Sequence, residues 1–158
     1  MNIHNQDKTK LVNSVFDKVY KNYDLMNDLM SFGIHRFWKK NLITWMNPQL
    51  GNKIIDVAAG TGDLARMISK KNDNKNIFCC VEPNKGMLRI GKEKLKHLKN
   101  IKWYLNSAET LPFKENTFDF YTISYGIRNV TDINKCLREA YRVLKPGGRF
   151  FCLEFSTV

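Results

Sequence analysis

The sequence has no apolar run near the roughly 20 residues of a membrane-spanning helix, and its longest apolar stretches, at 54–59 and 118–123, are short. Its 4 cysteines form no C-x-x-C pair and its 3 histidines form no cluster, so we expect no metal site and interpret the cysteines as reduced thiols. Residues 1–10 lack both the apolar core of a secretory signal and the Arg-rich character of a transit peptide. We therefore expect a cytoplasmic protein.

What the sequence does contain is enough apolar material for one globular unit. The chain has 158 residues, of which 43% are hydrophobic, and it shows no internal repeat or linker, so we predict a single domain over 1–158. The net charge of +11 comes mostly from dispersed lysines. We therefore expect no nucleic-acid partner, although weak peripheral contact with the inner membrane surface fits the charge.

Periodicity predicts helices first and then alternation. The apolar residues of 12–23 recur every three or four positions, and Ile34, Trp38, Leu42, Trp45 and Met46 mark one side of a second helix that ends before Pro48. These helices suggest a lid over 1–50 above a core over 51–158. In the core, strands at 53–58, 77–81, 101–105, 118–124 and 149–155 are separated by helices such as 84–98 and 132–144. This order predicts an α/β, Rossmann-like, doubly wound parallel sheet.

The first strand runs into a glycine turn. The segment Gly60-Thr61-Gly62-Asp-Leu-Ala fits G-x-G-x-x-A, which lets a cofactor approach the backbone at the start of a helix. The next strand ends at Glu82, 22 residues after Gly60, which is close to the spacing of a carboxylate that accepts ribose hydroxyls. Together they predict an adenosine site; the alternative is a structural turn and a surface glutamate.

The charge near the turn favours one adenosine cofactor over another. Asp56 precedes the turn and Asp63 directly follows Gly62, so carboxylates flank the place where a dinucleotide would put its pyrophosphate. S-adenosylmethionine carries no phosphate, and its ammonium and sulfonium groups suit nearby carboxylates. We therefore predict S-adenosyl-L-methionine, with Asp56 among its binding residues, rather than NAD.

Two later segments fit the same site. After the third strand, Ser107 and the backbone of Ala108 are expected at the adenine edge, unless this is an ordinary loop. The fourth strand ends at Ser124 and is followed by Arg128 and Asn129, at the edge where open α/β sheets bind ligands.

Two long motifs resemble a known family. The segment 23–38, YDLMNDLMSFGIHRFW, and the segment 142–156, RVLKPGGRFFCLEFS, look like the two signatures of the ubiquinone/menaquinone biosynthesis methyltransferases, the UbiE family of class I S-adenosylmethionine-dependent enzymes. The resemblance covers about 10–156 and implies cofactor contacts at Thr61, Glu82, Ser107, Ala108 and Ser124. Two positions depart from the family pattern: Ala59 stands where many members have Gly, and Glu82 where many have Asp. Family members also continue beyond the second signature into closing antiparallel strands, so we expect a C-terminally truncated chain with weak or no activity.

The implied reaction is C-methylation of a polyprenylated benzoquinol or demethylmenaquinol ring. We expect Arg128 and Asn129 to hold the phenolate and a water molecule, and His35 to be the base, although His35 is equally expected to form only a local hydrogen bond. Tyr23 and Asn27 are expected to contact the substrate, although Tyr23 continues an apolar helix face.

Three other functions remain open. An NAD-dependent oxidoreductase shares the glycine turn and the acidic strand end. A nucleic-acid methyltransferase would suit the positive charge, but its N-P-P-[YF] motif is absent. A noncatalytic S-adenosylmethionine-binding fragment would keep the pocket without turnover. The ring type, the prenyl length and the oligomeric state do not follow from the sequence.

Overall fold

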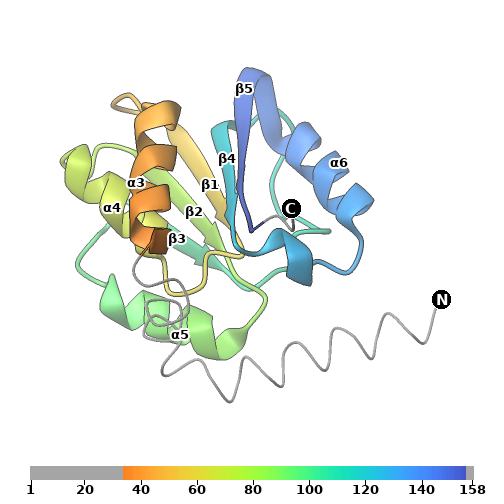
Figure 1. The fold of residues 1–158 in the computed structure, drawn as a ribbon, viewed down its shortest axis with the longest axis horizontal. Coiled ribbons are helices and arrows are strands. Elements are labelled where there is room, and N and C mark those ends of the chain that lie inside the picture. Colours follow the sequence, from red (N-terminus) through yellow and green to blue (C-terminus); the bar gives the residue numbers. More distant parts are fainter. Residues whose placement is uncertain (1–33, 156–158) are drawn as a thin grey trace.

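A computed structural model describes residues 34–155 as one parallel β-sheet with helices on both faces (Figure 1). The strand order in the five-stranded sheet is β3-β2-β1-β4-β5, and every pairing between its strands is parallel. The predicted α/β, doubly wound fold is therefore confirmed. The elements in chain order are α3 (Ile34–Met46), β1 (Lys53–Val57), α4 (Asp63–Lys71), β2 (Ile77–Val81), α5 (Lys85–Lys94), β3 (Ile101–Tyr104), β4 (Phe118–Ser124), the 3-10 helix η2 (Ile127–Asn129), α6 (Ile133–Val143) and β5 (Leu144–Leu153).

Two apolar layers hold the sheet between its helices. Alternate residues of the strands point to opposite faces, so Ile54 and Phe78 pack with α3 and α4 on one face, whereas Ile55 and Tyr121 pack with α6 on the other. The four cysteines are free thiols in β2, α6 and β5, as expected. No helix of residues 34–155 is long and apolar enough to cross a membrane.

The helix predicted around Trp38 exists as α3, but the predicted apolar face is wrong in three positions. Ile34, Trp38 and Trp45 are exposed, and the buried residues of α3 are His35, Leu42, Ile43 and Met46. These buried residues of α3 face the sheet, and Arg149 of β5 donates a hydrogen bond to the Met46 carbonyl. Since Met46 is fully buried, α3 is part of the packed core. The division into a lid over 1–50 and a core stays a prediction, and the helix expected over 12–23 lies outside the described residues.

The strands at 77–81 and 118–124 are confirmed over their whole length, but the last strand differs from the prediction. It begins at Leu144 rather than at residue 149, and it ends at Leu153. The register along β4 jumps from Phe118↔Leu144 to Phe120↔Arg149, so the Lys-Pro-Gly-Gly segment forms a bulge within β5. An edge strand tolerates Pro146 because its missing N–H faces no second neighbour.

Candidate functional site

The carboxyl ends of β1 and β4 lie together at one edge of the sheet. Ala58 and Tyr125, which directly follow these strands, have φ values of +53° and +57°, a left-handed conformation that is uncommon for residues other than glycine. A Cβ on Gly126 would lie 2.4 Å from the Cβ of Ala58, so the two strand ends touch. Ala59, the position that departs from the family pattern, is not among the residues with positive φ. Such local strain is typical of functional edges.

The glycine turn needs glycine for conformation and for space. Gly60 and Gly62 have φ values of +59° and +81°, which favour glycine. A Cβ on Gly62 would lie 2.8 Å from Leu95 and 2.9 Å from the Trp103 ring. Thr61, between the glycines, is buried, and its hydroxyl lies 3.5 Å from Lys94 Nζ. The turn is therefore held closely against α5 and β3.

The carboxylate of Glu82 is bound to this turn. Its Oε2 accepts a hydrogen bond from the Gly60 N–H at 2.8 Å, and its Oε1 accepts one from the Asn84 N–H at 2.9 Å. Burial raises the pKa of Glu82 to about 7, with a smaller contribution from the nearby charge of Asp56. Each oxygen keeps a second lone pair, so the ionised group can still accept hydroxyl donors. Glu82 thus links the end of β2 to the turn that follows β1.

Asp56 lies in β1 rather than on the open edge. It is buried, its carboxylate accepts a hydrogen bond of 2.8 Å from the Thr122 hydroxyl, and burial raises its pKa to about 6. Because the charge of Asp56 contributes to the raised pKa of Glu82, the two carboxyls are close enough to concentrate negative charge near the glycine turn. Such a site favours a cationic ligand over a phosphate.

Asp63, at the start of α4, has partners of its own. Lys39 of α3 lies 3.1 Å from one of its oxygens and Arg66 lies 2.8 Å from the other. Burial alone would raise the pKa of Asp63, but these two cations outweigh it and lower the pKa to about 2. The Lys39 pair was not anticipated, since its partner is 24 residues away. Asp63 is therefore a helix anchor whose charge is already matched, so the carboxylates that disfavour a pyrophosphate here are Asp56 and Glu82.

The loop after β3 and the end of β4 supply the remaining predicted cofactor positions. Ala108 is buried in the core, and the Ser107 hydroxyl lies 3.2 Å from that of Thr110. At the end of β4, the buried Oγ of Ser124 has no hydrogen-bond partner within residues 34–155. A buried hydroxyl without a partner is costly, so this atom fits a site that a polar ligand completes.

The predicted catalytic residues lie on two different elements. Arg128 and Asn129 form η2, and Arg128 Nη1 lies 3.3 Å from Glu154 Oε1, with its guanidinium 5.7 Å from the centre of the Phe155 ring. The partner Glu154, which directly follows β5, was not anticipated. His35 is buried in the first turn of α3, one turn before Lys39, which reaches Asp63 beside the glycine turn. Tyr23 and Asn27 lie outside the described residues.

Comparison with known proteins decides the family. The profile of the ubiE/COQ5 methyltransferase family matches residues 2–158, nearly the whole chain. The chain belongs to this family. The resemblance seen in the two signatures is therefore confirmed, and membership of a methyltransferase family implies S-adenosyl-L-methionine as the cofactor.

Two curated relatives illustrate how near the family members are. The chain is 54% identical over 158 residues to the "Ubiquinone/menaquinone biosynthesis C-methyltransferase UbiE" of Rickettsia bellii, an alignment that covers 96% of this chain and 63% of that protein. It is 43% identical to the "2-methoxy-6-polyprenyl-1,4-benzoquinol methylase, mitochondrial" of Dictyostelium discoideum, covering 99% of this chain and 60% of that protein. This ubiE/COQ5 family chain thus spans less than two thirds of the length of these relatives.

Solved structures agree on the fold. The YcgJ protein from Bacillus subtilis matches with a TM-score of 0.69 and 27% identity over 73% of this chain and 49% of that one. A SAM-dependent methyltransferase from Aquifex aeolicus matches with a TM-score of 0.63 and 24% identity, over 68% of this chain and 58% of that one. The sheet of this ubiE/COQ5 family member is therefore of the class I methyltransferase type.

Proposed function

We propose that this chain is the cofactor-binding part of a C-methyltransferase that acts on the ring of a polyprenyl benzoquinol or of a demethylmenaquinol. The observation that carries the proposal is the arrangement of Glu82 and Ser124 around the glycine turn. Glu82 has free lone pairs beside Gly60, and the Ser124 hydroxyl is buried without a partner in the described part of the chain. The names of the Rickettsia and Dictyostelium relatives support the choice of a quinol ring.

Each residue has a defined role in binding the cofactor. Glu82 accepts hydrogen bonds from the two ribose hydroxyls, and the Gly60–Gly62 turn lets the backbone approach the ligand. Ser107 and the Ala108 backbone bind the adenine edge, and Ser124 binds the polar tail. Asp56 contributes negative potential from below the turn and thereby favours the cationic donor.

The same edge supplies what the ring needs. When bound, S-adenosylmethionine supplies a methyl group whose bond to sulfur breaks as the new carbon–carbon bond forms. Arg128 and Asn129 hold the phenolate that makes the ring carbon nucleophilic, and in-line positioning supplies much of the rate. His35 takes up the proton released from the ring, because a neutral imidazole has one ring nitrogen that can accept a proton. Tyr23 and Asn27 contact the substrate in this proposal.

Peripheral contact with an anionic membrane belongs to the same proposal, because a polyprenyl tail partitions into lipid. The outer face of α3 exposes Phe37, Trp38 and Trp45 beside the exposed cations Arg36 and Lys40. Aromatic residues beside basic ones are typical of helices that lie in a membrane interface. Sedimentation with vesicles that contain phosphatidylglycerol, compared with pure phosphatidylcholine, tests this part.

The first test is calorimetric titration with S-adenosylhomocysteine, with NADH in parallel. We expect binding of S-adenosylhomocysteine alone, weakened by Glu82→Ala, followed by methyl transfer from labelled S-adenosylmethionine to a short-chain quinol. Binding of NADH alone would refute the proposal in favour of an oxidoreductase. Cofactor binding without transfer to any quinol would instead identify a noncatalytic fragment.

A further inference from the structure

The loop that carries the expected adenine contacts has only long hydrogen bonds between its own residues. Within this loop, which follows β3, the Thr110 N–H lies 3.4 Å from the Ser107 carbonyl, and Asn106 Nδ2 lies 3.4 Å from the Thr110 carbonyl. These distances exceed those of good hydrogen bonds. The backbone around Ala108 is therefore positioned mainly by something outside the loop.

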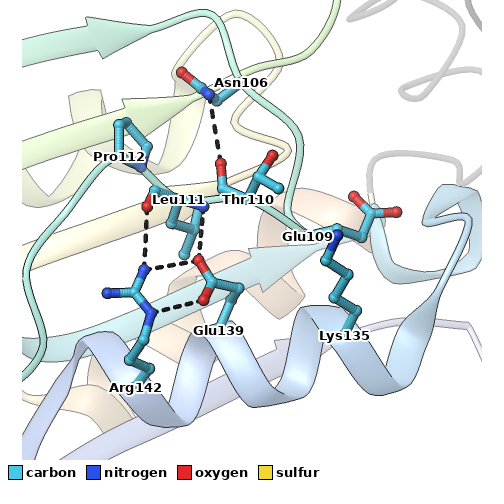
Figure 2. A pocket seen from close by; sticks show the side chains of 8 residues that line it. All are labelled: Asn106, Glu109, Thr110, Leu111, Pro112, Lys135, Glu139 and Arg142. Carbon is cyan, nitrogen blue, oxygen red and sulfur yellow. Dashed lines mark hydrogen bonds and ion pairs between the residues drawn. The ribbon is translucent and has the colours of Figure 1, made fainter.

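Two charged side chains of α6 supply short bonds to the loop, as Figure 2 shows. Glu139 Oε2 accepts a hydrogen bond of 2.7 Å from the Leu111 N–H. Arg142 donates from Nη1 to the Phe113 carbonyl at 2.6 Å and from Nη2 to the Leu111 carbonyl at 3.1 Å. Three backbone groups of the loop are thus bound by one pair of side chains on a helix.

Glu139 and Arg142 also form a bidentate ion pair with each other. Arg142 Nε lies 2.6 Å from Glu139 Oε1, and Nη2 lies 2.7 Å from Oε2. Hydrogen bonds from Arg142 are the main reason that the pKa of Glu139 lies below its ordinary value, so the pair stays charged at neutral pH. Because a planar fork fixes orientation as well as distance, the pair is a rigid support for the loop.

A second anchor of the loop is Glu109, which directly follows Ala108. Glu109 Oε1 accepts hydrogen bonds from the N–H groups of Thr131 and Asp132, at 2.9 and 3.3 Å, directly before α6. The groove of 490 Å³ between loop and helix, lined by both anchors, lies beside this support and not beside Glu82. Both ends of α6 thus hold the loop.

We propose that the Glu139–Arg142 pair of α6 is a positioning device that sets the base specificity of the cofactor site by holding the loop at Ser107 and Ala108 in register with the adenine edge. The inference rests on the proposed function, since it requires that this loop reads the base. Neither side chain touches the cofactor; both act through the backbone of Leu111 and Phe113. If the loop were loosened, Glu82 would still bind the ribose, but the hydrogen bonds between the loop and the base edge would be poorly placed.

The test compares S-adenosylhomocysteine with S-inosylhomocysteine, in which a carbonyl replaces the adenine amino group and N1 carries a hydrogen, so that the donor and the acceptor on the base edge exchange places. Calorimetry gives the affinity ratio for the unaltered chain, Arg142→Lys and Glu139→Gln. We expect the unaltered chain to prefer the adenine compound, and each variant to lower this preference about fivefold to tenfold through misplaced hydrogen bonds. Arg138→Lys, at an exposed position of the same helix, is the matched control and should keep the ratio.

A purely structural role of the pair would lower the affinities for both compounds by the same factor, which leaves their ratio unchanged. An unchanged ratio would overturn the inference, and so would an equal affinity of the unaltered chain for both compounds. If a variant folds poorly, amide hydrogen exchange of residues 107–110 in the other variant decides, because the inference requires faster exchange there than in Arg138→Lys. Failure of the unaltered chain to bind either compound would instead refute the proposed function, and the inference would fall with it.

Discussion

Replacement of Glu82 by Gln should change how the stability of the fold depends on pH. Burial raises the pKa of this carboxyl from its ordinary 4.5 to about 7, so the folded state binds the proton more tightly than the unfolded state. The stabilisation is complete below about pH 4.5 and is lost as the pH rises through 7. A rise of this size corresponds to about 3 kcal/mol of unfolding free energy. Glu82→Gln cannot ionise and should remove this loss.

Asp56 produces a loss of the same sign, because burial raises its pKa from 3.8 to about 6. It interacts with Glu82, so the two losses do not simply add. Asp63 and Glu139 have lowered pKa values, and their stabilisation is lost only when the pH falls below the ordinary carboxyl range. Of these four carboxyls, Asp56 and Glu82 are therefore the two that change the free energy of unfolding between pH 5 and 8.

The assay is urea unfolding of the chain and of Glu82→Gln at a series of pH values and constant ionic strength. The free energy of unfolding of the unaltered chain should fall between pH 5 and pH 8. In the variant, this fall should be smaller by about 3 kcal/mol. Glu93→Gln, at an exposed position, should leave the slope unchanged. Parallel curves for the unaltered chain and Glu82→Gln would show that the carboxyl is not held as the structure has it.

Three further substitutions separate packing, hydrogen bonding and binding. Gly91→Ala puts a Cβ 2.2 Å from the Trp103 ring and should cost about 1–3 kcal/mol in urea unfolding, with recovery when Trp103 is replaced by Leu. Thr122→Val removes the donor to Asp56 and should cost about 1–3 kcal/mol, and the pH at which stability declines should rise, as followed by unfolding across pH. Ser124→Ala removes a buried hydroxyl that has no partner among the described residues, so the free energy of unfolding should be unchanged or should rise, by up to about 1–3 kcal/mol, while calorimetry shows weaker binding of S-adenosylhomocysteine; an unchanged affinity would exclude Ser124 from the site.

The sequence by itself determined the sheet and the place of the glycine turn. Short apolar runs such as 77–81 and 118–124 can be read locally, because a strand buried on both faces needs apolar residues throughout. The Gly60–Gly62 turn and Glu82 can be recognised from spacing, because the length of a strand–helix–strand unit determines how far apart the two strand ends lie in the sequence.

Only the tertiary structure decided how side chains with several options are used. The buried face of α3 could not be chosen locally, because large apolar residues lie around the whole helix. Trp38 and Trp45 are exposed, whereas contact with Arg149 and the sheet places Met46 in the core. Asp63 looked like a free carboxylate in the sequence, yet Lys39 reaches it from another helix. The support of the loop after β3 by Glu139 and Arg142 joins segments about 30 residues apart. Periodicity and spacing report on backbone geometry, whereas the partner of a charge depends on which elements the fold brings together.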